Sequence, residues 1–149
     1  MSSSLVEANK AVVRRMVDEV QVGGREDVAA ELLAADFLHH GGPEWARALP
    51  GPESAVMFAR HLRAALSDLE AVIHQQVGEG DLVVTQKTFR GTHVGELLGI
   101  PPSGAKVVID GIDIIRVVDG RLTEHWTIAD MANVLSGGRA RVPPSVGRE

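Results

Sequence analysis

Residues 107–128 read VVIDGIDIIRVVDGRLTEHWTI, and this stretch decides the fold. Its first half, Val107 to Val118, is rich in β-branched residues, and its second half, Arg121 to Ile128, resumes after Asp119-Gly120. Two β-rich runs joined by a short turn that contains Gly predict an antiparallel hairpin.

Two further strand patterns lie upstream of this hairpin. Apolar and polar residues alternate from 70 to 77, the turn Gly78-Glu79-Gly80-Asp81 follows, and residues 82–93 are again β-rich. A loop at residues 100–104 leads into the hairpin. We therefore expect a meander of four antiparallel strands.

The first half of the chain has helical spacing instead. Apolar residues recur every three or four positions over residues 4–21, 25–34 and 52–69, and Pro52 suits the first position of the third helix. Residues 36–51 read as a turn-rich segment. Helices segregated from strands predict an α+β fold, in which three N-terminal helices cover one face of a curved, mostly antiparallel sheet.

Length and composition limit what the chain can be. Its 149 residues predict a single domain over 1–136, followed by a flexible tail over 137–149 that is poor in apolar residues. A net charge of -5 disfavours nucleic acid as a partner, and no apolar stretch is long enough to cross a membrane. No signal peptide begins the sequence, so we expect a cytoplasmic protein.

The residue types present also exclude several kinds of chemistry. Without cysteine there is no disulfide, thiolate nucleophile or cysteine zinc site. The six histidines show no metal-ligand spacing, and no Gly-rich phosphate loop is present. We therefore expect neither a metal nor a cofactor.

Four short motifs carry a resemblance to a known family. They are Asp36–His40, Gly91–Glu96 with Gly99-Ile100-Pro101-Pro102 behind it, Gly111–Ile114, and Asp119–Trp126. At this spacing the chain resembles the SnoaL-like polyketide cyclases, whose cone-shaped fold is shared with ketosteroid isomerases and limonene epoxide hydrolases. The resemblance implies a cone-shaped barrel around one apolar pocket and a small hydrophobic organic substrate. It also implies ring closure of a polyketide-derived intermediate.

The turn of the hairpin decides which side chains face each other. A two-residue turn would place Asp113 opposite Trp126, whereas a three-residue loop with Gly120 in a left-handed bulge would place Asp113 opposite His125. We expect the three-residue loop. The resemblance assigns four positions on one sheet face to the pocket: Gly111, Asp113, His125 and Thr127.

Asp113 and His125 are the candidate catalytic residues. A buried carboxylate has a raised pKa and a neighbouring imidazolium lowers it, so the pair could exchange protons near neutral pH. The alternative is a buried hydrogen bond that only fixes the hairpin. Thr127 stands where the resemblance places an acid-base aspartate. Either Asp113 takes over the proton transfer, or the pocket only folds the substrate into a reactive shape.

The other candidates are expected to bind substrate, and for each of them a purely structural position is the alternative. His40 lines the pocket mouth or lies in a surface loop, while His39 beside it should point elsewhere. Lys87, on the same strand as Phe89, faces inward with a partner or extends to solvent. Trp45 covers the pocket as a lid or lies exposed. Asp130 reaches the pocket or caps a short helix at residues 131–135.

The opposite face of the hairpin is apolar, with Ile112, Ile114, Trp126 and Ile128 in line. Since the resemblance gives the pocket the helix side, we expect a homodimer that packs through these residues. Three functions stay open: a cyclase, an isomerase or epoxide hydrolase of the same fold, and a non-catalytic ligand-binding protein. If Lys87 and His125 enclosed Asp113 and left no cavity beside it, a non-catalytic ligand-binding protein would be favoured.

Overall fold

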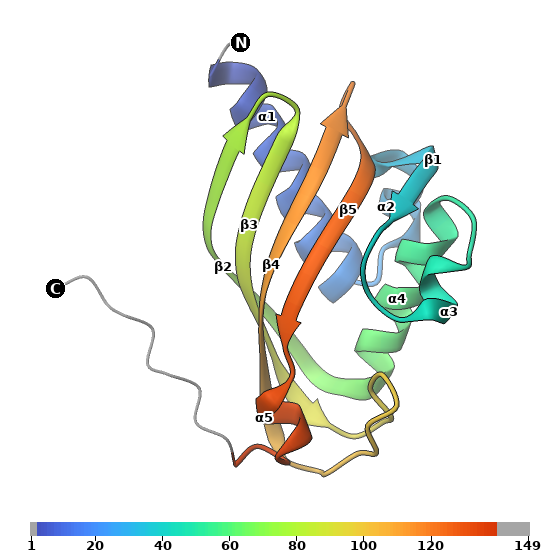
Figure 1. Ribbon diagram of the computed structural model, residues 1–149, viewed down its shortest axis with the longest axis vertical. Coiled ribbons are helices and arrows are strands. Elements are labelled where there is room, and N and C mark those ends of the chain that lie inside the picture. The colour runs from blue at the N-terminus through green and yellow to red at the C-terminus, as the bar shows by residue number, and fades with distance from the viewer. Residues whose placement is uncertain (1–2, 140–149) are drawn as a thin grey trace, which may run out of the picture.

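The computed structural model describes residues 3–139 as helices packed against one curved, unclosed sheet (Figure 1). The helices are α1 (Ser3–Arg15), the π-helix η1 (Met16–Val22), α2 (Glu26–Leu32), α3 (Glu44–Arg47), α4 (Pro52–Ala65) and α5 (Ala132–Leu135). The strands are β1 (Leu33–His39), β2 (Leu66–Glu79), β3 (Leu82–His93), β4 (Lys106–Val118) and β5 (Arg121–Asp130).

The three predicted helices are present, with changed ends. The first continues from α1 into η1, and its buried stripe is Val13, Met16, Val17 and Val20. The third begins with Pro52 as predicted but ends at Ala65, because the chain turns into strand β2 at Leu66. The predicted α+β class is confirmed.

The sheet has the strand order β1-β5-β4-β3-β2, in which β2 to β5 form the predicted antiparallel meander. Strand β1 was not predicted: it begins at Leu33, inside the expected second helix, and pairs in parallel with β5. The expectation of turns from residue 36 onward was therefore wrong as far as His39.

The hairpin turn also differs from the prediction. Asp119 and Gly120 form a two-residue turn with positive φ of 51° and 76°, as a type I′ turn requires. A bulge at Thr123 then shifts the register, so Asp113 pairs with Thr127 rather than His125. The observed partner of Asp113 lies two residues beyond the expected one. Because side chains alternate with a period of two, Asp113, His125 and Thr127 still share one face of the sheet.

The helices cover only one face of the sheet, and the core lies between these two layers (Figure 1). On the uncovered face, Ile112, Ile114 and Ile128 are exposed, Ile128 to 81% of its surface. Most of the predicted tail, residues 140–149, lies outside the described residues. Within residues 3–139, no helix is long and apolar enough to cross a membrane.

Candidate active site

An interior cavity of about 210 Å³ lies between the helix-side face of the sheet and the helices. Strands β3, β4 and β5 supply one wall, and α4 supplies Phe58 and Leu62 opposite. Leu97 and Leu98, from the loop after β3, close one side. The walls are mainly apolar, so the few polar side chains that reach the cavity define its chemistry.

Three of these polar side chains form a charged cluster. Lys87 pairs with Asp113 through Nζ and Oδ2, and His125 Nε2 lies 3.3 Å from Asp113 Oδ1. Lys87 is 5% exposed and Asp113 only 2%. The inward-facing alternative for Lys87 is therefore the observed one. Two cationic or potentially cationic groups thus flank one buried carboxylate.

This environment keeps Asp113 ionised. Burial alone raises the pKa of the Asp113 carboxyl, but the Lys87 ammonium and the neighbouring His125 together hold that pKa below its usual range. The expectation of an Asp113 poised near neutral pH is therefore corrected. The carboxylate is a stable anion that can orient a partner, and it is a poor proton acceptor.

His125 is better placed to exchange a proton. Its Nε2 faces Asp113, although the two are not aligned as a hydrogen bond, and among residues 3–139 no protein group bonds its Nδ1. His125 lines the cavity, and its ring stacks on His39 at a centroid distance of 4.6 Å. The carboxylate and the stacked ring hold the imidazole while one nitrogen stays available.

The prediction for the two adjacent histidines is reversed. His39, at the end of β1, points inward to stack on His125 and meets Phe58 edge-on. His40 lies on the outer face, where it stacks on Trp126 and its Nε2 lies 2.9 Å from Glu124 Oε2. Successive side chains of an extended chain point to opposite faces, so His39 at the end of β1 points inward and His40 after it points outward. The opposite orientation was predicted because β1 was not recognised.

His39 gives the protein a predicted pH dependence. Burial, followed by the nearby His125, lowers the pKa of His39 to about 4. Between its ordinary pKa and this value the unfolded chain binds a proton that the folded chain does not. Stability is thus full at neutral pH, and we expect it to fall by about 2 kcal/mol as the pH drops toward 4, allowing for partial exposure of the ring.

The variant His39→Phe should lose this part of the pH dependence, because phenylalanine cannot bind a proton. Urea denaturation of both proteins at neutral pH and near the lowered pKa gives the difference. Equal losses of unfolding free energy in the two proteins would contradict the assignment to His39.

The remaining predicted site residues are divided between the two faces. Phe89, Gly111 and Thr127 line the interior cavity, and Lys87 Nζ lies 5.1 Å from the Phe89 ring centre. Trp45 is 42% exposed and meets His61 edge-on, outside the residues that line the cavity. Asp130 accepts a hydrogen bond from the Ala132 backbone at 2.9 Å, but it lies one residue before Met131, the N-cap residue of α5.

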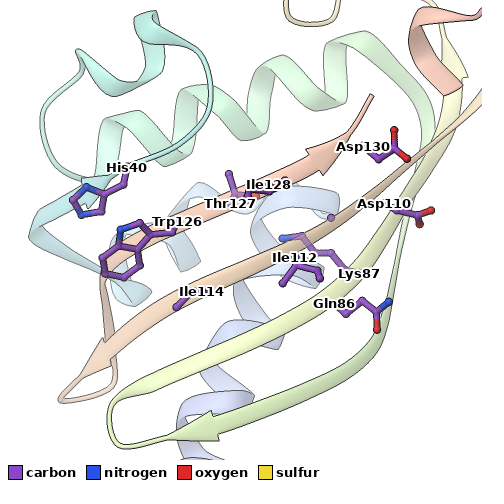
Figure 2. Close-up of a pocket in the computed structure, with 11 residues that line it drawn as sticks. His40, Gln86, Lys87, Asp110, Ile112, Ile114, Trp126, Thr127, Ile128 and Asp130 are labelled. Atoms are coloured by element: carbon purple, nitrogen blue, oxygen red, sulfur yellow. The ribbon is translucent and has the colours of Figure 1, made fainter. Parts of the chain in front are cut away.

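A second and larger hollow, of about 610 Å³, lies on the outer face of the sheet. Figure 2 shows Ile112, Ile114, Trp126 and Ile128 projecting from this face, with His40 beside Trp126. Asp110 and Asp130 stand at its far end. The hollow is open to solvent. Of the charged cluster, Lys87 lines this hollow, whereas Asp113 and His125 do not. We therefore place the candidate active site in the interior cavity.

Sequence reasoning missed two polar residues of the interior. His39 was assigned elsewhere because β1 was not recognised. Gln21, near the end of η1, lines the cavity and is 8% exposed. Its position beside Val17 and Val20 on the buried stripe was the available signal. Among the described residues, no three histidine or acidic side chains are grouped to hold a metal ion.

Residues 11–136 match the model of a protein family that is described as SnoaL-like polyketide cyclase. Among curated proteins, the aklanonic acid methyl ester cyclase DnrD of Streptomyces peucetius is 33% identical over 117 residues. That match covers 76% of this chain and 79% of the relative.

Solved structures show the same similarity. A protein of Jannaschia sp. CCS1, assigned to the SnoaL-like polyketide cyclases, superposes with a TM-score of 0.78 at 28% identity, over 95% of this chain and 99% of the other. TsrD of Streptomyces laurentii superposes with a TM-score of 0.75 at 26% identity, over 95% and 99% of the two chains.

Proposed function

Because the chain belongs to the SnoaL-like polyketide cyclase family, we propose that it closes a ring in a polyketide-derived substrate bound in the interior cavity. His125 transfers the proton, and Asp113 acts as a positioning residue that holds the imidazole. The observation that carries the proposal is the arrangement at His125, where one ring nitrogen faces a buried anion and the other has no partner among residues 3–139. This division of roles is the one found in carboxylate–histidine catalysis.

The proposed reaction is an intramolecular aldol addition. His125 removes a proton from a carbon that is acidified by neighbouring carbonyl groups, leaving an enolate. The enolate carbon forms a bond to a ketone carbon of the same molecule, and the carbonyl π electrons become an alkoxide. The imidazolium returns its proton to that alkoxide, so the product is an isomer of the substrate.

Lys87 supports this chemistry through its charge. Its ammonium lies in the cavity wall next to Asp113, and low solvent access strengthens its field. A negative charge that develops on an enolate or alkoxide would be stabilised by it. Thr127, opposite Asp113, offers only a hydroxyl to the substrate, so the acid-base work stays with His125.

The remaining cavity argues against the purely structural alternative. Asp113 is sealed by Lys87 and His125, as that alternative requires, but about 210 Å³ of space is left beside them. No observation favours isomerisation or epoxide hydrolysis in the same way. The substrate class and the cytoplasmic location remain predictions.

The direct test uses aklanonic acid methyl ester, the compound in the names of the curated relatives. We expect the protein to convert it, or a related polyketide ester, to a product of unchanged mass and different retention, as followed by liquid chromatography with mass detection. Binding without conversion of any such ester would support a non-catalytic ligand-binding protein instead.

We also propose that a second copy of the chain covers the outer face. Ile112, Ile114 and Ile128 are exposed together there, and contiguous apolar patches on a surface often mark protein–protein interfaces. Light scattering should report a dimer for the wild type and a monomer for Ile128→Lys, which places a charge on this face. A monomeric wild type would contradict the proposal.

A further inference from the structure

Three buried polar atoms that have no hydrogen-bond partner within the described residues belong to side chains that line one small cavity. They are Gln21 Oε1, His39 Nδ1 and His125 Nε2. The cavity measures about 20 Å³ and adjoins the larger one, because Gln21, Lys87, Asp113 and His125 line both. Each unsatisfied buried polar atom has lost the hydrogen bonds that it would make to water in the unfolded chain, so three around one cavity require an explanation.

The size and chemistry of this small cavity fit one water molecule. A cavity accepts a water when it offers roughly 10–15 Å³ or more and two to four polar partners. A water molecule both donates and accepts hydrogen bonds. It can therefore donate to Gln21 Oε1 and bond an imidazole nitrogen in either protonation state.

The residues around the small cavity are held in place by other contacts. Arg63 donates to the backbone oxygens of Val20 and Gln21 at 2.7 and 3.2 Å, which fixes the end of η1. His39 is held between the rings of His125 and Phe58. The His39 ring therefore cannot easily turn its Nδ1 toward another partner, and the Gln21 backbone is fixed next to the cavity.

We propose that the small cavity binds one ordered water molecule, held by Gln21, His39 and His125, and that this water fixes the orientation of the His125 imidazole. His125 Nε2 lies 3.3 Å from Asp113 Oδ1 without being aligned to it, so the water supplies the hydrogen bond that this nitrogen lacks. This inference deepens the proposed function, since His125 is the proposed proton-transfer residue. Gln21 and His39 become positioning residues.

A high-resolution crystal structure of the wild type tests the water directly, with no substrate present. We expect an oxygen peak within roughly 2.7–3.2 Å of Gln21 Oε1 and of at least one of the two imidazole nitrogens. A structure with no peak in this cavity, or with a peak bonded to none of the three side chains, would overturn the proposal.

Variants give a second test in solution. Oxygen-17 relaxation counts long-lived buried waters, and we expect Gln21→Met to have one fewer than the wild type. Gln76→Met is the matched control, because Gln76 Oε1 is also buried with no partner in the described part of the chain, but Gln76 lines a separate surface cavity. Equal water counts in the wild type and Gln21→Met would overturn the proposal, as would the same loss in both variants.

Kinetics separate this role from direct substrate binding. With a substrate that the wild type converts, Gln21→Met should lower kcat roughly 10-fold and leave KM nearly unchanged, because the water orients His125 and not the substrate. A raised KM with unchanged kcat would assign Gln21 to the substrate and contradict the proposal. The water measurements need no turnover, so they decide the inference even if the proposed function fails.

Discussion

Replacing Lys87 with methionine should lower the free energy of unfolding by about 3–5 kcal/mol. Asp113 is 2% exposed, and its pKa is held low largely by the Lys87 charge. Methionine fills similar space without that charge, so the variant leaves a buried carboxylate without its main partner. Urea denaturation at neutral pH measures the loss.

The double variant Lys87→Met, Asp113→Leu should recover most of that loss, because it removes the buried charge as well as its partner. Lys10→Met is a matched control, since Lys10 forms an exposed ion pair with Glu7 and should change stability by less than about 1 kcal/mol. A Lys87→Met protein as stable as the wild type would show that the buried pair does not form in solution.

His125→Gln should reduce kcat by about 10²–10⁴-fold, the range that general acid–base groups contribute. Glutamine keeps a polar side chain in the cavity but cannot accept and return a proton at neutral pH. KM should change little, because the cavity walls that contact the substrate remain. His74→Gln is the control, since His74 bonds Thr88 and does not line the interior cavity. An equal loss of kcat in both variants would contradict the assignment.

Asp113→Asn tests the positioning role separately. An uncharged amide no longer presents a negative charge to the imidazole, so kcat should fall while KM stays nearly unchanged. A kcat that falls only in proportion to the folded fraction of the variant would mean that Asp113 acts only on the stability of the hairpin.

Much of the fold could be predicted because its patterns are local. The β-branched run of β4 and the spacing of apolar residues in α1 and α4 each report one element. Strand β1 could not be predicted in this way. Leu33 and Ala34 continue the helical spacing of α2, and only the parallel pairing with the distant β5 makes the segment a strand.

The candidate site was predicted in part for a similar reason. The prediction that Asp113, His125 and Thr127 share one face rests on the period of two. It was therefore correct although the turn length was wrong and the bulge was not predicted. The ionised state of Asp113 could not be read from the strand pattern, because it depends on Lys87 from a neighbouring strand. Likewise, Gln21 reaches the cavity from a helix far away in the sequence.

The most direct test of the central claim is chemical rescue of His125→Gly with free imidazole. If His125 transfers the proton, the variant should be nearly inactive and should regain ring-closing activity as imidazole is added, with saturation. Asp113 and Lys87 remain in place in this variant to hold the added base. Full activity of His125→Gly without imidazole would contradict the claim and would show that the cavity acts only by folding its substrate.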